Sequence, residues 1–248
     1  MRPNDPATPD VMLRVCNLSH TYADGRPALR DLNFTLNTGE RLALVGPNGA
    51  GKTTLFLRLC GVLSGKPGHA TIGDLDPANP EHRKKLPSQV GVVFQNPDDQ
   101  LFAATLLEDV AFGPLNLGAT PTAAKQLAET ALKQVGLTDA GDRTPHKLSG
   151  GEKRRAAIAG VLAMKPNLLL LDEPSMFLDP RGRRELIRLL NELPCTLLIA
   201  THDLELVRET CPRVIVLDGG ELIIDGPTAD VFAHVELMDR HGLEVLGR

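Results

Sequence analysis

The sequence predicts an α/β fold built on a mainly parallel β-sheet, and three patterns indicate it. Short, nearly continuous apolar runs alternate with stretches of helical periodicity, as expected for strands buried on both faces between helices. The N-terminal part instead alternates apolar and polar residues, which suits a half-buried antiparallel layer. Between Pro97 and Lys147 strand character disappears, so we expect a helical insertion there.

The chain opens with the Pro-rich stretch MRPNDPATPD, and residues 1–10 are therefore expected to form a loose tail. The alternating segments of the antiparallel layer are Val11–Leu18 and Leu32–Leu36. The core strands are predicted at Leu42–Gly46, Val90–Gln95, Leu168–Asp172, Thr196–Thr201 and Arg213–Leu217. The helices between them are predicted at Thr53–Cys60, Glu152–Met164 and Asp179–Leu193.

The helical insertion is expected over about residues 97–165. Thr120–Pro121 opens a helix in it, because proline is favoured at the first helical position, and Gly136 ends that helix. Asp230–Arg240 also has a helical pattern, and residues 231–248 are expected to form a short C-terminal helical extension. We therefore predict one α/β domain over residues 11–230, with the helical subdomain inside it.

Composition narrows the classes of function. With 248 residues, 42% hydrophobic and 23% charged, the chain is typical of a globular protein with a sizeable core. Its 27 Lys and Arg against 31 Asp and Glu give no basic excess for wrapping nucleic acid, so no nucleic-acid partner is expected. No run approaches the ~20 apolar residues of a membrane span, so a membrane role would require attachment to another subunit. The four cysteines form no CxxC pair and predict buried or partly buried reduced thiols.

The strand at Leu42–Val45 leads directly into a phosphate-binding motif, GxxxxGK(S/T), and a helical pattern follows it. The glycines of such a motif let backbone N–H groups turn toward phosphate oxygens, and the helix N-terminus adds partial positive charge. Lys52 is expected to reach the β- and γ-phosphates, and the Thr53 hydroxyl to help hold Mg²⁺. The residues predicted to bind the nucleotide here are Gly46, Pro47, Asn48, Gly49, Ala50, Gly51, Lys52, Thr53 and Thr54.

A second apolar strand ends in two carboxylates, Asp172 and Glu173. In a nucleoside triphosphate site, the first is expected to serve Mg²⁺, directly or through water, and the second to act as general base toward the attacking water. By itself such a strand end is common. Its position after the phosphate-binding motif favours the catalytic interpretation.

The segment Leu148–Glu152, which reads LSGGE, decides the family. Alone it predicts an N-capped helix start or a further anion site. In order with the other motifs, it makes the chain resemble the ABC ATPases over roughly residues 11–230. The landmarks of that resemblance are Tyr22 for adenine stacking, Gly46–Thr53 for Walker A, Gln95 for the Q-loop, Leu148–Glu152 for the signature, Leu168–Glu173 for Walker B, Asp179 for the D-loop and His202 for the switch histidine.

The resemblance implies a P-loop NTPase fold of RecA-like type, and ATP hydrolysis that needs two chains. ATP and Mg²⁺ held at Lys52 of one subunit would meet the signature residues of a second ABC ATPase subunit, which is either another copy or a close relative. Asp179 would lie at the same interface. The signature residues in question are Ser149, Gly150 and Gly151.

The same resemblance assigns further roles. Gln95 would contact Mg²⁺ and transmit the ATP cycle to a membrane subunit, while His202 would act with Glu173 in catalysis. Small residues usually stand at the Met176 and Phe177 positions in this family, so the D-loop of this chain is expected to pack differently.

The stretches Asn96–Phe102 and Thr105–Gly113 look like those of cobalt, nickel and energy-coupling-factor importer ATPases. Such importers pair the ATPase with a transmembrane coupling subunit and a substrate-capture subunit, at the cytoplasmic face of the cell membrane. Cobalt, nickel or a vitamin all remain open as the substrate. Leu101 and Phe102, beside the acidic Asp98 and Asp99, either anchor the membrane partner or pack the helical subdomain.

Two other classes of function stay open at this stage. A DNA-repair or chromosome ATPase of the same superfamily would carry a long coiled coil, yet the stretch between Lys52 and Ser149 is short and has no sustained heptads. A non-catalytic ATP-binding scaffold would be favoured by loss of Glu173 or His202, and both are present.

Overall fold

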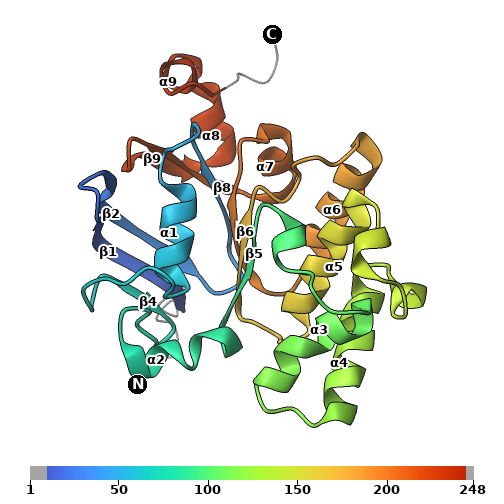
Figure 1. The fold of residues 1–248 in the computed structure, drawn as a ribbon. Coiled ribbons are helices and arrows are strands. Elements are labelled where there is room, and N and C mark those ends of the chain that lie inside the picture. The colour runs from blue at the N-terminus through green and yellow to red at the C-terminus, as the bar shows by residue number, and fades with distance from the viewer. Residues whose placement is uncertain (1–9, 244–248) are drawn as a thin grey trace, which may run out of the picture.

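The computed structural model describes residues 10–243, and its strands form two sheets (Figure 1). The larger sheet has the order β5-β6-β7-β3-β8-β9, and the smaller has the order β2-β1-β4. All pairs in the larger sheet are parallel except β8 and β9 at one edge. Its strands are β3 (Arg41–Val45), β5 (Val90–Val93), β6 (Leu168–Asp172), β7 (Thr196–Ala200), β8 (Arg213–Asp218) and β9 (Glu221–Pro227).

Alternate residues of the parallel strands serve two separate cores. On β6, Leu168 and Leu170 join a core that includes helix α1 (Lys52–Leu59) and the smaller sheet. Leu169 and Leu171 point to the opposite face, where a second core includes residues of α5 (Gly150–Leu162) and α6 (Pro180–Glu192). Because both faces are covered, every residue of β6 is buried, which explains the continuous apolar run in the sequence.

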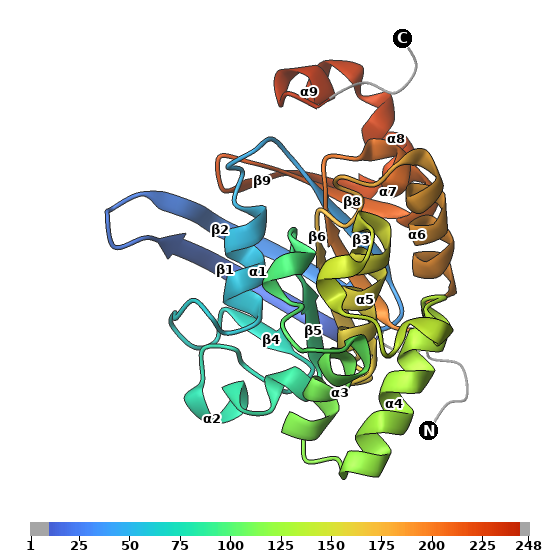
Figure 2. The same cartoon turned by 45° about the vertical axis from the view of Figure 1, so that its right-hand side comes forward.

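The smaller sheet covers α1 from outside, so this helix lies between the two sheets (Figure 2). Its strands are β1 (Val11–Thr21), β2 (Pro27–Asn37) and β4 (Ala70–Ile72), and β1 pairs antiparallel with both neighbours. The predicted α/β fold with an N-terminal antiparallel layer is confirmed. The prediction that all cysteines are at least partly buried is wrong for Cys16, which lies on the exposed face of β1.

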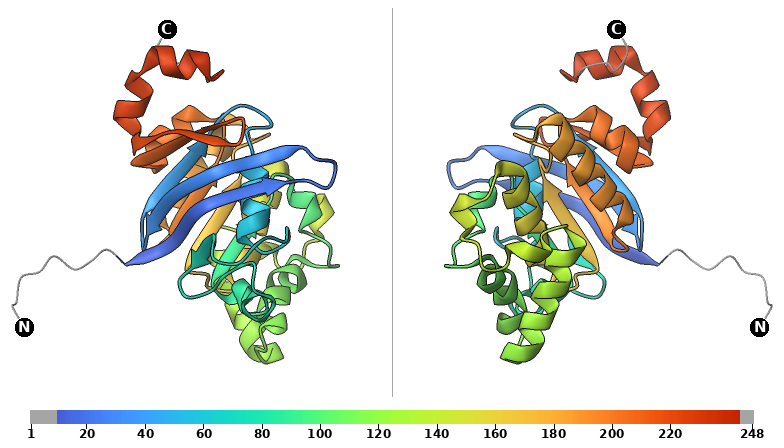
Figure 3. Two further views of the ribbon diagram at one scale, coloured as in Figure 1. Left: turned by 90° about the vertical axis from the view of Figure 1, so that its left-hand side faces the viewer. Right: turned by 90° about the vertical axis from the view of Figure 1, so that its right-hand side faces the viewer.

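The helical insertion consists of α3 (Leu106–Asn116), α4 (Pro121–Gln134) and α5, which pack against one another. Thr120 caps α4 through its side-chain oxygen, as the Thr-Pro pair predicted. The helical insertion lies on the opposite side of the larger sheet from β1 and β2 (Figure 3). The domain boundaries drawn from the sequence stay predictions, and residues 1–9 of the expected tail lie outside the described part of the chain.

Several element ends differ from the sequence prediction. Helix α5 begins at Gly150, two residues early, because Ser149 and Glu152 form a reciprocal capping box. Strand β5 ends at Val93 rather than at Gln95. The single helix expected over Asp230–Arg240 is wrong: α8 (Thr228–Ala233) and α9 (Val235–Arg240) are separated at His234, whose ψ of 68° is not helical.

Outside the helical insertion, four strands and α-helices had no sequence prediction: strand β4, α2 (Pro80–Arg83), α7 (Leu204–Thr210) and strand β9. Helices α8 and α9 stand at the end of the molecule farthest from α4 (Figure 3). Within residues 10–243, no helix combines the length and the apolar character needed to cross a membrane.

Candidate functional site

The phosphate-binding motif forms the loop between β3 and α1, at the carboxyl edge of the parallel strands, where α/β folds commonly bind ligands. Gly51 precedes the helix with φ of 107°, a conformation that favours glycine. A Cβ added at Gly46 would lie 1.9 Å from the carbonyl oxygen of Leu217 on β8. The loop therefore packs directly on the neighbouring strand, and this close approach requires glycine at position 46.

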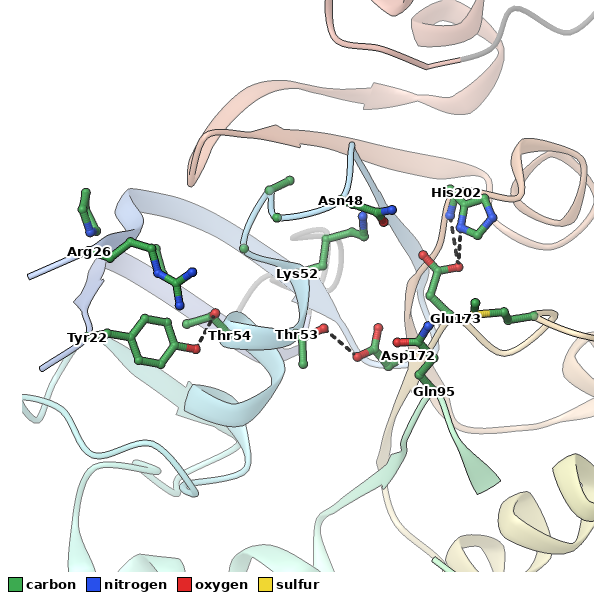
Figure 4. A pocket seen from close by; sticks show the side chains of 16 residues that line it. Tyr22, Arg26, Asn48, Lys52, Thr53, Thr54, Gln95, Asp172, Glu173 and His202 are labelled. Carbon is green, nitrogen blue, oxygen red and sulfur yellow. Dashed lines mark hydrogen bonds and ion pairs between the residues drawn. The ribbon is translucent and has the colours of Figure 1, made fainter. Parts of the chain in front are cut away.

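This loop is one wall of a pocket of about 480 Å³, a volume suited to a small molecule (Figure 4). The other walls come from the turn after β1 and from the ends of β5, β6 and β7. Most of the predicted site residues therefore meet at one place. The lining residues are Tyr22, Arg26, Pro27, Ala28, Asn48, Gly49, Ala50, Gly51, Lys52, Thr53, Thr54, Gln95, Asp172, Glu173, Met176 and His202.

Lys52 supplies a positive charge beneath the loop. Its Nζ donates hydrogen bonds to the carbonyl oxygens of Gly46, at 2.5 Å, and Pro47, at 3.1 Å. Burial lowers the pKa of this ammonium, and the nearby carboxylates of Glu173 and Asp172 partly offset that effect. A phosphate group in the loop would give the ammonium an anionic partner that the carbonyl oxygens do not provide.

Asp172 and Thr53 place two oxygen atoms side by side. The Thr53 hydroxyl donates to Oδ2 of Asp172 over 2.8 Å. Burial raises the pKa of Asp172, although the Thr53 hydrogen bond acts in the opposite direction. A hydroxyl and a carboxylate are ligand types that Mg²⁺ takes in nucleotide sites, so these residues fit that ion.

Glu173 is held in a strained and buried position. Its φ of 46° lies in the left-handed region, and strain of this kind clusters at functional sites. Oε2 accepts a hydrogen bond of 3.0 Å from the Thr201 hydroxyl and one of 3.3 Å from the backbone N–H of His202. Nδ1 of His202 lies 2.9 Å from the same oxygen (Figure 4). The carboxylate is therefore fixed from one side, with its pocket side free to meet a water molecule.

Gln95 follows β5 and reaches the same pocket. Its Nε2 donates to Sδ of Met176 at 2.7 Å. Buried Arg154 of α5 donates to the backbone carbonyl oxygens of Phe94, at 2.7 Å, and Gln95, at 2.5 Å. The segment that carries Gln95 is thus attached to the helix that begins at the LSGGE motif.

Tyr22 lies at the far end of the pocket from Glu173 (Figure 4). Its hydroxyl shares a hydrogen bond of 3.0 Å with the Thr54 hydroxyl. The guanidinium carbon of Arg26 lies 5.2 Å from the centre of the ring, a cation–π distance. An aromatic ring beside the phosphate-binding loop is a suitable surface for a nucleotide base, and its role in stacking stays a prediction.

The LSGGE motif lies outside this pocket. A separate hollow is lined by residues of the motif, by Asp179 and by the residues around it. There Glu152 forms a 2.6 Å ion pair with Arg143, and this hydrogen bond is the main reason that its pKa falls to about 2. The residues of the hollow are Ser149, Gly150, Gly151, Glu152, Arg155, Phe177, Leu178, Asp179, Arg181, Gly182 and Glu185.

Sequence reasoning missed Thr201 and Arg26, and it noticed Met176 only as an unusual D-loop residue and not as part of the pocket. Thr201 binds Glu173, and its only sequence signal is its position beside His202 at the end of a core strand. Arg26 and Met176 enter through loops, where no periodic pattern marks a side chain as facing a pocket. Thr201 and Arg26 belong to none of the motifs that carried the sequence argument.

Comparisons with known proteins agree with this geometry. The sequence profile of the ABC transporter family matches residues 29–176. The energy-coupling factor transporter ATP-binding protein EcfA of Methanothermobacter thermautotrophicus is 46% identical over 94% of this chain and 76% of its own length. The structure of cbiO1 from Clostridium perfringens, part of the ABC transporter complex cbiONQ, has a TM-score of 0.82 at 38% identity, covering 93% of this chain and 94% of that one.

A second similar structure is that of the ATP-binding cassette MJ0796, a dimer in a post-hydrolysis state bound to ADP and phosphate. It has a TM-score of 0.78 at 27% identity, and the alignment covers 88% of this chain and 99% of that chain.

Proposed function

The chain belongs to the ABC transporter ATP-binding family and is an ATPase, and from this premise we propose that it powers an importer of cobalt, nickel or a vitamin. The importer class is supported by the similarity to EcfA and to cbiO1 of the cbiONQ complex. The need for a second subunit is supported by the separation of the two halves of the site. Lys52, Asp172 and Glu173 share one pocket, whereas the LSGGE motif opens into another hollow. A second subunit is needed to bring such halves together.

Each nucleotide-site residue then has a role set by its position. Backbone N–H groups of the loop bind phosphate oxygens, Lys52 neutralises the β- and γ-phosphates, and Tyr22 stacks on adenine. Mg²⁺, held by Thr53, Asp172 and Gln95, would offset the phosphate charge when bound. Ser149, Gly150, Gly151 and Asp179 complete the site of the partner subunit.

Glu173 is the proposed general base. Its carboxylate accepts a proton from the attacking water, and His202 lies against the same carboxylate oxygen. Thr201 acts as a positioning residue, because its buried hydroxyl donates to Oε2 of Glu173 without lining the pocket itself.

Thr201→Val is expected to lower kcat for ATP hydrolysis about tenfold, the size of one hydrogen bond to a charged group, while KM changes little. The isosteric replacement removes one of the three groups that hold Oε2 of Glu173 in its productive position. Thr196→Val at the other end of β7 is the matched control, since Thr196 is equally buried and its hydroxyl accepts from Gly39 far from the pocket. Steady-state kinetics with an unchanged kcat in Thr201→Val would contradict the positioning role.

The transmembrane coupling subunit is proposed to dock on a groove between α3, α5 and the loop after β5. The groove has a volume of about 490 Å³ and is mainly apolar. Phe102 and Phe112 lie in it with exposed fractions of 65% and 49%, packed edge to face at 4.9 Å. Asp99 and Lys84 stand at its rim. Exposed aromatic side chains with a charged rim suit a partner helix.

The groove also changes the prediction made for Leu101 and Phe102 and for the two neighbouring aspartates. Leu101 is partly buried against the main core, so it packs the helical subdomain, and Phe102 is the exposed anchor. Asp98 forms a 2.6 Å ion pair with Lys153 of α5 and is therefore less suited to contact a partner than Asp99.

The double variant Phe102→Ala and Phe112→Ala is expected to keep the basal ATPase rate of the isolated subunit while pull-down of the membrane subunits and substrate uptake fall at least about tenfold. Val62→Ala is the control, because Val62 is 64% exposed and lies in a loop after α1. Co-purification from cells that express the full transporter, followed by uptake of cobalt, nickel or a vitamin, tests both the docking surface and the substrate class. Unchanged pull-down would remove the groove from the docking surface.

In the proposed assembly the chain lies at the cytoplasmic face of the cell membrane, together with a transmembrane coupling subunit and a substrate-capture subunit. No nucleic-acid partner is proposed. The domain over residues 11–230 supplies ATP hydrolysis, the insertion over about 97–165 carries the docking groove, and the C-terminal extension follows. A DNA-repair ATPase would instead be stimulated by DNA, and a scaffold would bind ATP without turnover. ATPase assays with and without DNA distinguish these alternatives: a rate that rises with DNA would support the repair class, and no turnover would support the scaffold.

A further inference from the structure

The segment between Glu173 and α6 carries an exposed phenylalanine in a backbone conformation that favours glycine. Phe177 has an exposed fraction of 83%, the highest among the large apolar side chains described as exposed in residues 10–243. Its φ of 64° lies in the left-handed region, where a non-glycine side chain is strained. Both features act against the stability of the isolated chain, and glycine at this position would remove both.

The position of Phe177 indicates what covers it. The side chain lines the hollow that also contains Ser149, Gly150 and Gly151. A partner that seats on these signature residues therefore covers Phe177 in the same contact. Met176, the preceding residue, lines the nucleotide pocket. Phe177 is thus located beside both surfaces that the proposed dimer brings together.

The residues that follow Phe177 are held in place. The Leu178 side chain lies close to Gly151, 3.9 Å from the position of a Cβ there. Asp179 caps α6 by accepting a 2.7 Å hydrogen bond from the N–H of Gly182. Because the residues after it are fixed, Phe177 is presented outward in a defined direction, which suits an interface anchor better than a loose surface side chain does.

We propose that Phe177 is an apolar anchor of the ATP-bound interface between two copies of this chain. The inference rests on the proposed function, since it is ATP that draws the signature surface onto a partner. In a two-fold symmetric pair each copy contributes one Phe177, so the interface buries two of these side chains. Burial on closure recovers apolar area that the monomer leaves in water.

The test uses the full chain with Glu173→Gln, which slows hydrolysis, and adds Phe177→Gly or Phe177→Asn. Both replacements tolerate a left-handed backbone, so neither is expected to lower the Tm of the nucleotide-free monomer. The dissociation constant of the MgATP dimer, measured by sedimentation over a range of protein concentrations, is expected to rise at least about tenfold, which corresponds to about 1.4 kcal/mol. Val62→Ala in the same background is expected to leave that constant unchanged.

The outcomes separate the inference from the function on which it rests. If the Glu173→Gln chain stays monomeric in MgATP, the proposed ATP-driven dimer fails and the anchor role fails with it. If that chain dimerises and the Phe177 variants dimerise equally well, only the anchor role is overturned. A drop in monomer Tm of more than about 2 °C in both variants would show that Phe177 packs within its own chain, and would also overturn the inference.

Discussion

Lys52→Ala is expected to nearly abolish ATP binding and turnover. Lys52 is 8% exposed, and its ammonium points into the loop that would hold the phosphates. Alanine removes the only charged group of the loop and leaves the phosphate charge without its buried partner. A loss of this kind costs at least ~10²-fold in catalytic rate, as measured for single donors that stabilise developing charge.

The measurement is nucleotide binding by fluorescence or calorimetry, together with phosphate release. Lys66→Ala provides the matched control, because Lys66 is an exposed lysine in the loop that follows α1. Normal ATPase rates in Lys52→Ala would remove the phosphate-binding assignment, and with it the pocket as the catalytic site. Equal losses in both variants would point to a general effect on the fold.

The sequence predicts the position of this loop well because its residues belong to a motif with fixed spacing. A strand, a glycine-rich turn and a helix must follow one another for backbone N–H groups to converge, so Gly46–Thr53 was placed correctly from local pattern alone. Strands β6 and β7 were predicted to within one residue for a related reason: both faces are covered, and the apolar run is continuous.

Three features were not predicted from the sequence, each for its own reason. Strand β9 pairs only at an edge and alternates weakly, so it has no clear strand pattern. Helix α5 begins two residues before its apolar periodicity indicates, because Ser149 and Glu152 form a capping box; the N-capped start that LSGGE allows is present, and only the boundary drawn from periodicity was late. The break at His234 divides a helical pattern that looks continuous in sequence.

The strain at Glu173 and at Phe177 was equally hidden, since positive φ at a non-glycine residue is fixed by the surrounding structure. The two residues lie four positions apart, on either side of the segment that joins the nucleotide pocket to the signature hollow. At Glu173 the strained backbone directs the carboxylate toward Thr201 and His202. Because Glu173 is both the proposed base and the start of the segment that leads to the signature hollow, its replacement tests catalysis and dimer formation together.

Glu173→Gln is expected to slow ATP hydrolysis by ~10²–10⁴-fold, the range for loss of a general base, without loss of ATP binding. Glutamine keeps the size of the side chain and an oxygen that accepts from Thr201, so the strained turn is expected to persist. It cannot take a proton from water. Removing a negative charge beside Asp172 and the phosphates also favours nucleotide binding.

Because hydrolysis is what would separate the two subunits, the same variant is expected to accumulate as an ATP-bound dimer. Light scattering with saturating MgATP measures this directly, and dimer is expected for Glu173→Gln but not for the chain carrying Lys52→Ala. Glu192→Gln at the end of α6 controls for the loss of a carboxylate, since Glu192 is exposed and outside the pocket. Undiminished hydrolysis in Glu173→Gln would assign the base to another residue. If hydrolysis is slow but the chain remains monomeric, Glu173 acts in catalysis without a site shared between two subunits. The hollow at the signature residues would then lose its proposed role.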